Sequence, residues 1–568
     1  MATTQQHNFI KHNQEIKTFD DIKPYYTNLL ERPLSSKSQV WQWLLDWSEL
    51  DCFVCEDFAW RYIKSTIDTN DTKAIDNFDD FVSNIEPEIT TMSNKISQRF
   101  LQDNVQLYID KAQLFTMIRD IKNDIELFCE ENLPIETEIQ QTTQKYNAIC
   151  SQMSVDVDNK KMTIQQANNY IKTAPRGERK RVWELVSQRQ LADSNKINEL
   201  LSNLISLRNQ MATNAGCNNY IDYRFKQLCR FDYTPADCFD FHNSIEKVVM
   251  PLLNDIHLRR KKLLQVDTLR PYDLAVDLPL GVNLKPFSTI DDLITKTMWC
   301  LRDIAPEFGM MINSLKSKGH LDLESRIGKA PGGYNYPLFD SNSSFIFMNA
   351  TNDINDMTTL LHESGHAIHA ALCSKQPLFD HRETPAEIAE LASMSMELIS
   401  MAHWHYFFKD ETELKIAKLT QLESVIAILP WIAAIDKFQH YLYTTPNHTV
   451  EQRTQAWLDI MAKFASPVVD YSGYDEAFKN RWQRQLHIFE TPLYYIEYGF
   501  AQLGAISIWK NYTENPQTTI DKYKKALALG YSRPIPEIYK TAGIDFCFTT
   551  EYISNLMDFV KNEIDKLC

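Results

Sequence analysis

His362-Glu363-Ser364-Gly365-His366 is the stretch that decides how this chain is interpreted, because two histidines four residues apart enclose a glutamate. The residues before it, Asp356 to Leu361, offer a capping position at Asp356 and an apolar run, which predicts a helix through the motif. Residues four apart lie on one face of a helix, so both imidazoles can reach one cation. Glu363 is offset by one residue, where its carboxylate can take a proton from a water molecule activated by that cation.

The ordinary alternative is a helix that happens to carry two stacked histidines. Gly365 argues against it, because a glycine inside a helix costs about 1 kcal/mol relative to alanine. A close approach of another backbone, or of a substrate, would explain why a glycine stands at this position.

A catalytic zinc ion needs a third protein ligand and one open position. Thr384-Pro385-Ala386-Glu387 is typical of a capping box with proline at the first helical position, which would occupy Glu387. Glu390 is then the first free carboxylate of the second helix, among small neighbours that permit tight packing. Glu397 shares its face but lies about 10 Å further along the axis, so we expect it to orient a ligand histidine instead. His362, His366 and Glu390 are therefore the predicted ligands of one zinc ion.

The composition predicts a mainly α fold, since 568 residues contain only 14 glycines and 22 prolines. This length predicts more than one lobe. We expect a helical amino-terminal lobe over 1–205. The catalytic region over 206–568 would hold a small sheet, the zinc-binding helices and a helical carboxyl-terminal lobe. The sheet is predicted from Ser344 to Asn349, directly before the motif helix, after a turn-rich loop from Gly328 to Gly333.

The charge and the cysteines indicate a cytoplasmic protein. The net charge of −16 argues against nucleic-acid or membrane partners. Met1 to Glu15 is polar, without the apolar core of a secretory signal, and the apolar run Val425 to Ile435 is too short to cross a bilayer. The 11 cysteines follow no framework spacing, which favours free thiols in a reducing compartment. Cys52 and Cys55 form a lone C-x-x-C, for which two helix residues are a better interpretation than a redox or zinc site.

From about Pro175 to its end, the sequence resembles the thimet oligopeptidase and oligoendopeptidase F family of zinc metallopeptidases. Several ordered motifs carry the resemblance in addition to the histidine pair. They are Arg230-Phe231-Asp232-Tyr233-Thr234, Arg270-Pro271-Tyr272-Asp273, Gly328-Lys329-Ala330-Pro331-Gly332-Gly333-Tyr334, the stretch Ala389 to Glu397, His487, and Pro492 to Gly499.

The resemblance implies a mainly helical body of two lobes that flank a deep central channel, with zinc at its floor and Glu390 as the third ligand. It also implies that a histidine and tyrosines of the late segment contact the substrate and stabilise the oxyanion. By position these are His487, Tyr494 and Tyr498, with Tyr495 competing with Tyr494 for its place. The alternative for each tyrosine is a packing role in an aromatic-rich helix.

The loop and strand before the motif helix offer a way to hold a peptide. A strand edge beside the metal can bind an extended peptide through main-chain hydrogen bonds. We therefore expect Gly332, Gly333 and Tyr334, together with Tyr495, to contact the substrate. A simple turn is the alternative for the two glycines.

These inferences combine into a zinc-dependent endopeptidase for short, unfolded oligopeptides. A carboxypeptidase on a similar helical scaffold is the alternative within enzymes. A peptide-binding protein without turnover is the alternative outside them, although binding alone would not need Glu363.

Overall fold

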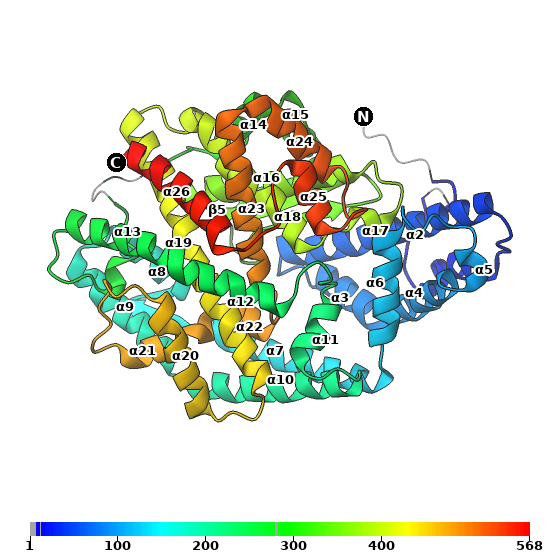
Figure 1. Cartoon of the computed structure of the whole chain (residues 1–568), viewed down its shortest axis with the longest axis horizontal. Helices are drawn as coiled ribbons and strands as arrows, with labels where there is room; N and C mark the ends of the chain where they lie inside the picture. Colours follow the sequence, from blue (N-terminus) through cyan, green and yellow to red (C-terminus); the bar gives the residue numbers. More distant parts are fainter. Residues whose placement is uncertain (1–6, 12, 279–281, 283) are drawn as a thin grey trace. The chain divides into compact units, whose positions relative to one another are not determined.

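The computed structural model describes residues 7–11, 13–278, 282 and 284–568 (Figure 1). Most of these residues are helical, which confirms the predicted mainly α class. The polar stretch from Met1 to Glu15, on which the expectation of no secretory signal depends, lies partly outside the described residues.

The chain divides into two compact units, each assembled from three segments. The first contains Met1–Glu126, Lys285–Lys409 and Gly504–Phe546, and the second contains Leu127–Leu284, Asp410–Leu503 and Cys547–Cys568. The predicted boundary after residue 205 falls inside helix α10 of the second unit. Each unit combines segments from both sides of that boundary. The deep channel expected from the resemblance stays a prediction.

The first unit begins with helices around an aromatic core. Its long helix α2 starts after Ser36, whose side chain accepts a hydrogen bond from the backbone N–H of Gln39. Trp43 of α2 stacks on Phe100 with 6.5 Å between ring centroids. The elements of this part are η1 (Phe19–Asp21), α1 (Lys23–Glu31), α2 (Lys37–Ile67), α3 (Thr72–Asp80), the π-helical η2 (Phe81–Ile85), α4 (Glu86–Phe100), α5 (Asp103–Gln106) and α6 (Phe115–Leu127).

The rest of the first unit contains a three-stranded sheet in the order β3-β5-β4. The middle strand β5 pairs in parallel with β3 and antiparallel with β4, with Tyr334 opposite Phe347. The sheet confirms the strand predicted from Ser344 to Asn349, and α16 packs against it. The elements are α14 (Ile290–Ile304), α15 (Pro306–Lys318), β3 (Leu321–Glu324), β4 (Tyr334–Leu338), β5 (Ser343–Ala350), α16 (Ile354–Cys373), α17 (Phe379–Arg382), α18 (Ala386–Ser400), η6 (Met401–Tyr406), α24 (Pro516–Leu527) and α25 (Ile535–Ala542).

The second unit is organised around α19, which contacts α10, α11, α12, α13, α20 and α26. Its helix α23 continues into the first unit, since the division falls between Leu503 and Gly504. The elements are η3 (Glu130–Asn132), α7 (Leu133–Ser151), β1 (Ser154–Val157), β2 (Lys160–Thr163), α8 (Ile164–Thr173), α9 (Arg176–Leu191), α10 (Ser194–Asn214), α11 (Tyr220–Gln227), α12 (Pro235–Ser244), the π-helical η4 (Ile245–Val249), α13 (Met250–Leu263), η5 (Pro271–Asp273), α19 (Glu411–Thr444), α20 (Val450–Phe464), α21 (Asp475–Lys479), η7 (Arg481–Arg484), α22 (Leu486–Phe489), α23 (Ile496–Glu514) and α26 (Thr550–Leu567).

Helix α19 contains the apolar run that the sequence analysis assigned to a buried helix. Val425 and Ile435 at the ends of that run are both buried, and Pro430 lies within the helix. By length and composition alone, α19 is the one helix among the described residues that would be able to cross a membrane. However, 61% of its apolar window is buried inside the protein, as in a core helix.

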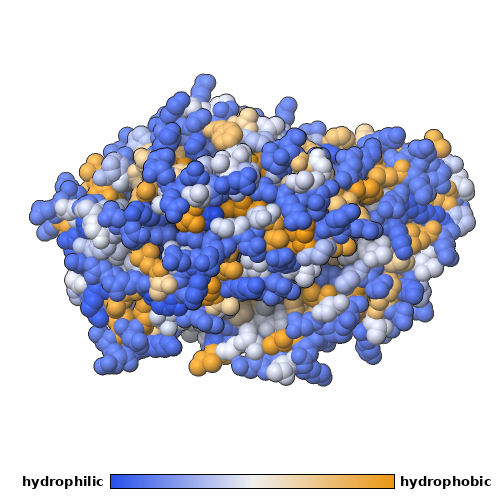
Figure 2. All heavy atoms as spheres, turned by 90° about the horizontal axis from the view of Figure 1, so that it is seen from below, coloured by the Kyte–Doolittle hydropathy of each residue, from blue (hydrophilic) through white to orange (hydrophobic). Residues whose placement is uncertain are grey.

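The face drawn in Figure 2 is covered mostly by hydrophilic residues, with apolar residues between them in separate groups. The large apolar side chains that are exposed belong to many different elements rather than to one helix or sheet face. Scattered exposed apolar residues are normal for a globular surface.

One hairpin interrupts the helical amino-terminal lobe that the sequence predicts over 1–205. Strands β1 and β2 pair antiparallel around Asp158 and Asn159, which have φ values of 51° and 63°. Two residues with positive φ form the turn that matches the twist of a tight hairpin, and Asp and Asn tolerate this conformation. Val155 and Val157 alternate with polar residues and are buried. The hairpin signal was therefore present in the sequence and was missed.

All 11 cysteines are free thiols. Cys52 and Cys55 lie in one long helix, in agreement with the interpretation as helix residues. Burial raises the pKa of the Cys52 thiol to about 12, so this pair does not have the reactive thiolate of a redox site.

A buried ion pair explains two of the motifs that carry the family resemblance. Arg230 donates from both Nε and Nη2 to Oε1 of Glu497, at 3.0 and 2.6 Å. Only 1% and 4% of the two side chains are exposed. The pair joins the segment after α11 to the first turn of α23.

We predict that Glu497→Gln destabilises the protein by about 3 kcal/mol, because it removes the negative charge that pairs with the buried guanidinium of Arg230. The measurement is the midpoint of thermal unfolding followed by tryptophan fluorescence. Glu476→Gln is the matched control, since Glu476 pairs with Lys479 at the surface and such pairs contribute at most about 1 kcal/mol. Equal midpoints for the two variants would contradict the prediction.

Candidate metal centre and active site

The helix that carries the histidine pair, α16, begins three residues earlier than the sequence suggested. The side chain of Asp353 accepts a hydrogen bond from the N–H of Asn355. Asp356, the predicted cap, instead accepts from the N–H groups of Asp353 and Thr351, at 2.9 and 2.7 Å. The prediction of the cap was wrong because Asp356 completes a capping box whose first member is Asp353.

Helix α18, which carries Glu390, packs closely along α16 (Figure 1). A Cβ atom at Gly365 would lie 2.6 Å from Cα of Ser393 and 2.8 Å from the carbonyl oxygen of Ala392. The close backbone approach expected from the glycine is therefore present, and only a residue without a side chain permits it.

The capping box predicted at the start of α18 is not formed. The N-cap is Pro385, without a side-chain hydrogen bond, and Glu387 is buried. The sequence argument for Glu390 excluded Glu387 as a capping residue, and that cap was predicted incorrectly. The packing of α18 on α16 is what places Glu390 beside the histidines.

The structure brings His362, His366 and Glu390 together. Their candidate ligand atoms all lie within 4.8 Å of one another. Oε2 of Glu390 lies 3.4 Å from Nε2 of His362 and 3.7 Å from Nε2 of His366. Tetrahedral zinc ligands at ~2.0–2.1 Å from the ion are about 3.3 Å apart, so this donor set fits a zinc ion with small adjustments.

Two further side chains hold the donors in place. Oε1 of Glu397 lies 2.7 Å from Nδ1 of His362, so a proton on Nδ1 is donated to the carboxylate and Nε2 keeps its lone pair for a metal. Ser393 donates its hydroxyl to Oε2 of Glu390 at 2.9 Å. The role of Ser393 was not predicted, although it lies one helical turn after Glu390.

Glu363 is buried beside the histidines, and Nδ2 of Asn335 on β4 donates to its backbone carbonyl at 3.3 Å. Burial raises the pKa of Glu363 to about 7. A divalent cation next to this carboxyl group would favour its charged form and lower that value.

The two histidines differ in protonation before any cation is considered. Burial lowers the pKa of His366 to about 4, which keeps its imidazole neutral, as a metal ligand requires. For His362 burial lowers the pKa, but the carboxylates of Glu390 and Glu397 raise it more strongly. A cation bound by His362 and Glu390 would take the place of that proton.

The loop and strand expected to contact a peptide lie in the same unit as the histidines. Gly332 has a φ of +98°, and a Cβ atom at Gly333 would lie 3.3 Å from the carbonyl oxygen of Phe347. The ring of Tyr334 stacks on Phe347 with 4.7 Å between centroids, and its hydroxyl lies 2.7 Å from Oγ1 of Thr66. The Tyr334 side chain is thus engaged in packing, and its backbone is paired with Phe347 of β5.

The structure gathers His487 and the three tyrosines into one aromatic cluster in the second unit. The His487 ring lies 4.7, 5.8 and 6.2 Å from the rings of Tyr495, Tyr498 and Tyr494. Tyr498 in turn lies 5.6 Å from both other tyrosines. All three tyrosine rings therefore lie beside the His487 ring. Ring distances alone do not decide whether Tyr494 or Tyr495 has the role expected for one of them.

The tautomer of His487 follows from two residues that the sequence analysis did not single out. Nε1 of Trp431 donates to Oε1 of Gln485 at 2.8 Å, which turns the amide nitrogen of Gln485 toward Nδ1 of His487 at 2.7 Å. Burial lowers the pKa of His487, so the ring is neutral. Nδ1 accepts from Gln485, and the proton is therefore on Nε2, where it can be donated.

The family model described as "Peptidase family M3" matches residues 169–558. The chain belongs to peptidase family M3. A second model, the "Peptidase M3 N-terminal domain", matches residues 9–128, a region for which the sequence motifs indicated no relatives.

Two curated relatives illustrate the similarity within family M3. An oligoendopeptidase F homolog of Borreliella burgdorferi is 26% identical over 348 residues, 58% of this chain and 58% of the relative. The oligopeptidase PepF of Bacillus subtilis is 24% identical over 302 residues, 52% of this chain and 44% of the relative. The matched regions therefore span about half the length of these relatives.

Solved structures share the fold over nearly the whole chain. A PZ peptidase A, solved with an inhibitor, has a TM-score of 0.89 at 24% identity and covers 98% of both chains. An oligoendopeptidase F from Enterococcus faecium has a TM-score of 0.65 at 16% identity and covers 97% of both chains. At these identities the likeness concerns the fold alone.

We predict that Gly365→Ala weakens the metal centre, because the added Cβ atom meets the Ser393 backbone and forces α16 and α18 apart. Overpacking of this kind costs roughly 1–3 kcal/mol. The measurements are the thermal midpoint and the affinity for zinc in competition with a chelator. Gly177→Ala in α9 is the matched control, since a Cβ atom there meets nothing within 4 Å. A Gly365→Ala protein with the zinc affinity and midpoint of the wild type would disprove the packing role.

Proposed function

We propose that this protein is a zinc-dependent endopeptidase that hydrolyses internal bonds of short, unfolded oligopeptides. The observation that carries the proposal is the convergence of two imidazoles and the Glu390 carboxylate beside a buried Glu363. Within family M3 we assign the chain to the oligoendopeptidase F branch rather than the thimet branch. The two curated relatives described above are named as an oligoendopeptidase F homolog and as oligopeptidase PepF.

His362, His366 and Glu390 would hold the zinc ion, which would polarise the scissile carbonyl and lower the pKa of a water molecule. Glu363 takes the proton of the attacking water on its carboxylate and later passes it to the nitrogen of the leaving amine. Glu397 accepts the Nδ1 proton of His362 and so holds the ring with Nε2 toward the ion.

His487 and a tyrosine are proposed to stabilise the oxyanion. The Nε2–H of His487 is a hydrogen-bond donor, because Gln485 occupies Nδ1. The phenol of Tyr494 or Tyr498 adds a second donor, and fixed donors of this kind act where negative charge develops. Tyr495 is assigned to substrate contact.

The peptide is proposed to lie along β4. In the three-stranded sheet β4 is an edge strand, because β5 occupies its other side. An extended peptide can add to such an edge through main-chain hydrogen bonds, which requires an unfolded substrate but no particular sequence. Gly332, Gly333 and the backbone of Tyr334 lead into this edge.

The protein is proposed to act in the cytoplasm on peptides, without nucleic-acid or membrane partners, as its net charge of −16 and its free cysteines suggest. The zinc carboxypeptidase and the non-catalytic peptide-binding protein are the alternatives that the following experiment separates.

An internally quenched short peptide should be cut at internal bonds by the wild-type protein, with product masses recorded. Chelator should abolish cleavage and added zinc should restore it. Glu363→Gln should lower kcat by ~10²–10⁴, the range of general-base catalysis, while keeping its zinc. Glu324→Gln, at an exposed position of β3, is the matched control and should behave as the wild type.

Two results would overturn the endopeptidase assignment. Stepwise release of carboxyl-terminal residues would show a carboxypeptidase. A zinc-loaded wild-type protein that binds peptides but cleaves none would show a binding protein.

We predict that His487→Ala lowers kcat by ~10²–10³ and changes KM little, because its donor acts on the oxyanion rather than on the bound substrate. The zinc content should equal that of the wild type, which separates this effect from damage to the metal centre. A variant with a raised KM and an unchanged kcat would instead assign His487 to substrate binding.

A further inference from the structure

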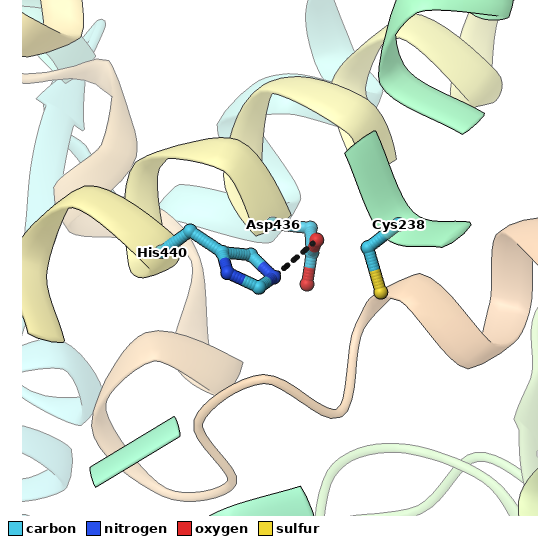
Figure 3. Close-up of side chains that lie close together, drawn as sticks. All are labelled: Cys238, Asp436 and His440. Carbon is cyan, nitrogen blue, oxygen red and sulfur yellow. Dashed lines mark ion pairs between the residues drawn. The ribbon is translucent and has the colours of Figure 1, made fainter. Parts of the chain in front are cut away.

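A second group of metal-binding side chains lies in the second unit and uses none of the residues assigned above. Cys238 on α12 and Asp436 and His440 on α19 offer ligand atoms that all lie within 4.8 Å of one another. Figure 3 shows Asp436 between the other two side chains, with His440 on the same helix and Cys238 on the neighbouring one. The cluster thus joins two helices that pack against each other.

On both α12 and α19 these residues have the spacing that is typical of metal ligands on a helix. Asp436 and His440 are four residues apart on α19, and Cys238 and His242 are four apart on α12. Each pair therefore occupies one face of its helix, the face turned toward the other helix. The first metal centre uses the same spacing for its two histidines.

Burial without hydrogen-bond partners makes the cluster energetically unfavourable when no ion is bound. Cys238, Asp436 and His242 are fully buried and His440 is 3% exposed. Among the described residues, Oδ1 of Asp436 and both ring nitrogens of His440 have no hydrogen-bond partner. A buried polar atom left without a partner costs about 1–3 kcal/mol, so several in one cluster call for an explanation.

The distances from Asp436 to the two histidines differ: the distance to His440 is that of two metal ligands, and the distance to His242 is that of a hydrogen bond. Nε2 of His440 lies 3.4 Å from Oδ2 of Asp436 without hydrogen-bonding geometry, close to the ~3.3 Å between two tetrahedral zinc ligands. Nε2 of His242 lies 2.8 Å from the same oxygen, which is a hydrogen bond. His242 therefore orients the carboxylate, as Glu397 orients His362 in the first centre.

The charge of the cluster matches a divalent cation. A Cys238 thiolate and the Asp436 carboxylate carry two negative charges, and an imidazole that coordinates a metal adds none. Burial raises the pKa of the Cys238 thiol, so without a cation the thiol keeps its proton. Thiolate, imidazole and carboxylate together suit zinc among the common divalent ions.

We propose that Cys238, Asp436 and His440 bind a second zinc ion, which ties α12 to α19, with His242 positioning the carboxylate. Binding displaces the thiol proton to solvent, and the Sγ, carboxylate oxygen and imidazole nitrogen each donate an electron pair to the ion. Because the ligands are buried, the ion has a structural role and does not meet a peptide.

The test replaces zinc with cobalt(II), which gives a near-ultraviolet thiolate-to-metal charge-transfer band only when a cysteine is a ligand. The proposed catalytic centre has no cysteine, so the band reports on the second site whether or not the proposed function is correct. The probe is cobalt(II) added to chelator-treated full-length protein, with bound metal counted by elemental analysis.

The wild-type protein should show the band, and His366→Ala should keep it while losing the metal of the first centre. Cys238→Ser should lose the band and its equivalent of metal and should unfold at a lower temperature. Cys547→Ser, at a half-buried cysteine outside the cluster, is the matched control and should keep the band. His440→Gln gives the same test if Cys238→Ser does not fold.

Absence of the band from the folded wild-type protein would overturn the proposal. The negative charge of Asp436 would then be balanced by a proton shared within the cluster. A band that survives in Cys238→Ser would also overturn it. Loss of peptidase activity in His366→Ala with retention of the band separates the two metal centres.

Discussion

The backbone contact between Gly365 and Ser393 is the constraint on which the proposed metal centre depends. It sets the distance between α16 and α18, and the ligands come from both helices. Glu390 and Glu397 lie on either side of Ser393 along α18, so one carboxylate reaches Nε2 of His362 and the other reaches Nδ1. Metal–ligand distances tolerate only about 0.2 Å, whereas an added methyl group would require a larger shift between the helices. The glycine in the middle of the motif is therefore as much a part of the centre as its ligands.

The sequence predicted the histidine motif and its helix from local spacing, and it failed for the helix caps and for contacts between distant segments. The histidine pair, the helix that carries it and the strand before it follow from residues close together in the chain. The caps of α16 and α18 were predicted at the wrong residues, because several polar side chains near a helix start compete for one role. The Trp431–Gln485–His487 chain was unpredictable for a different reason. Trp431 lies 54 residues before Gln485 along the sequence, and no motif marks either residue.

The hairpin of β1 and β2 and the Cys238 cluster were missed although local signals existed. Asp158-Asn159 directly after the alternating Val155 and Val157 indicates a hairpin, but the surrounding helical periodicity dominated the interpretation. Together with His242, the cluster forms two pairs at a spacing of four, on α12 and α19, and either pair alone is common in any helix. Only the packing of the two helices brings the pairs together, so the sequence offered two weak patterns where the structure offers one site.

The exposure of the ligands separates the roles of the two centres. Side chains of His362 and His366 are 22% and 19% exposed, so a ligand position can face solvent and a substrate. Side chains of Asp436 and His440 are 0% and 4% exposed, which leaves no path for a peptide without opening the helix pair. A catalytic zinc keeps an open position, whereas a structural zinc is enclosed by protein. Metal exchange at the first centre then needs only solvent access, while exchange at the second requires α12 and α19 to separate. On the two proposals, the same helical spacing would serve catalysis where the ligands meet water and stability where they do not.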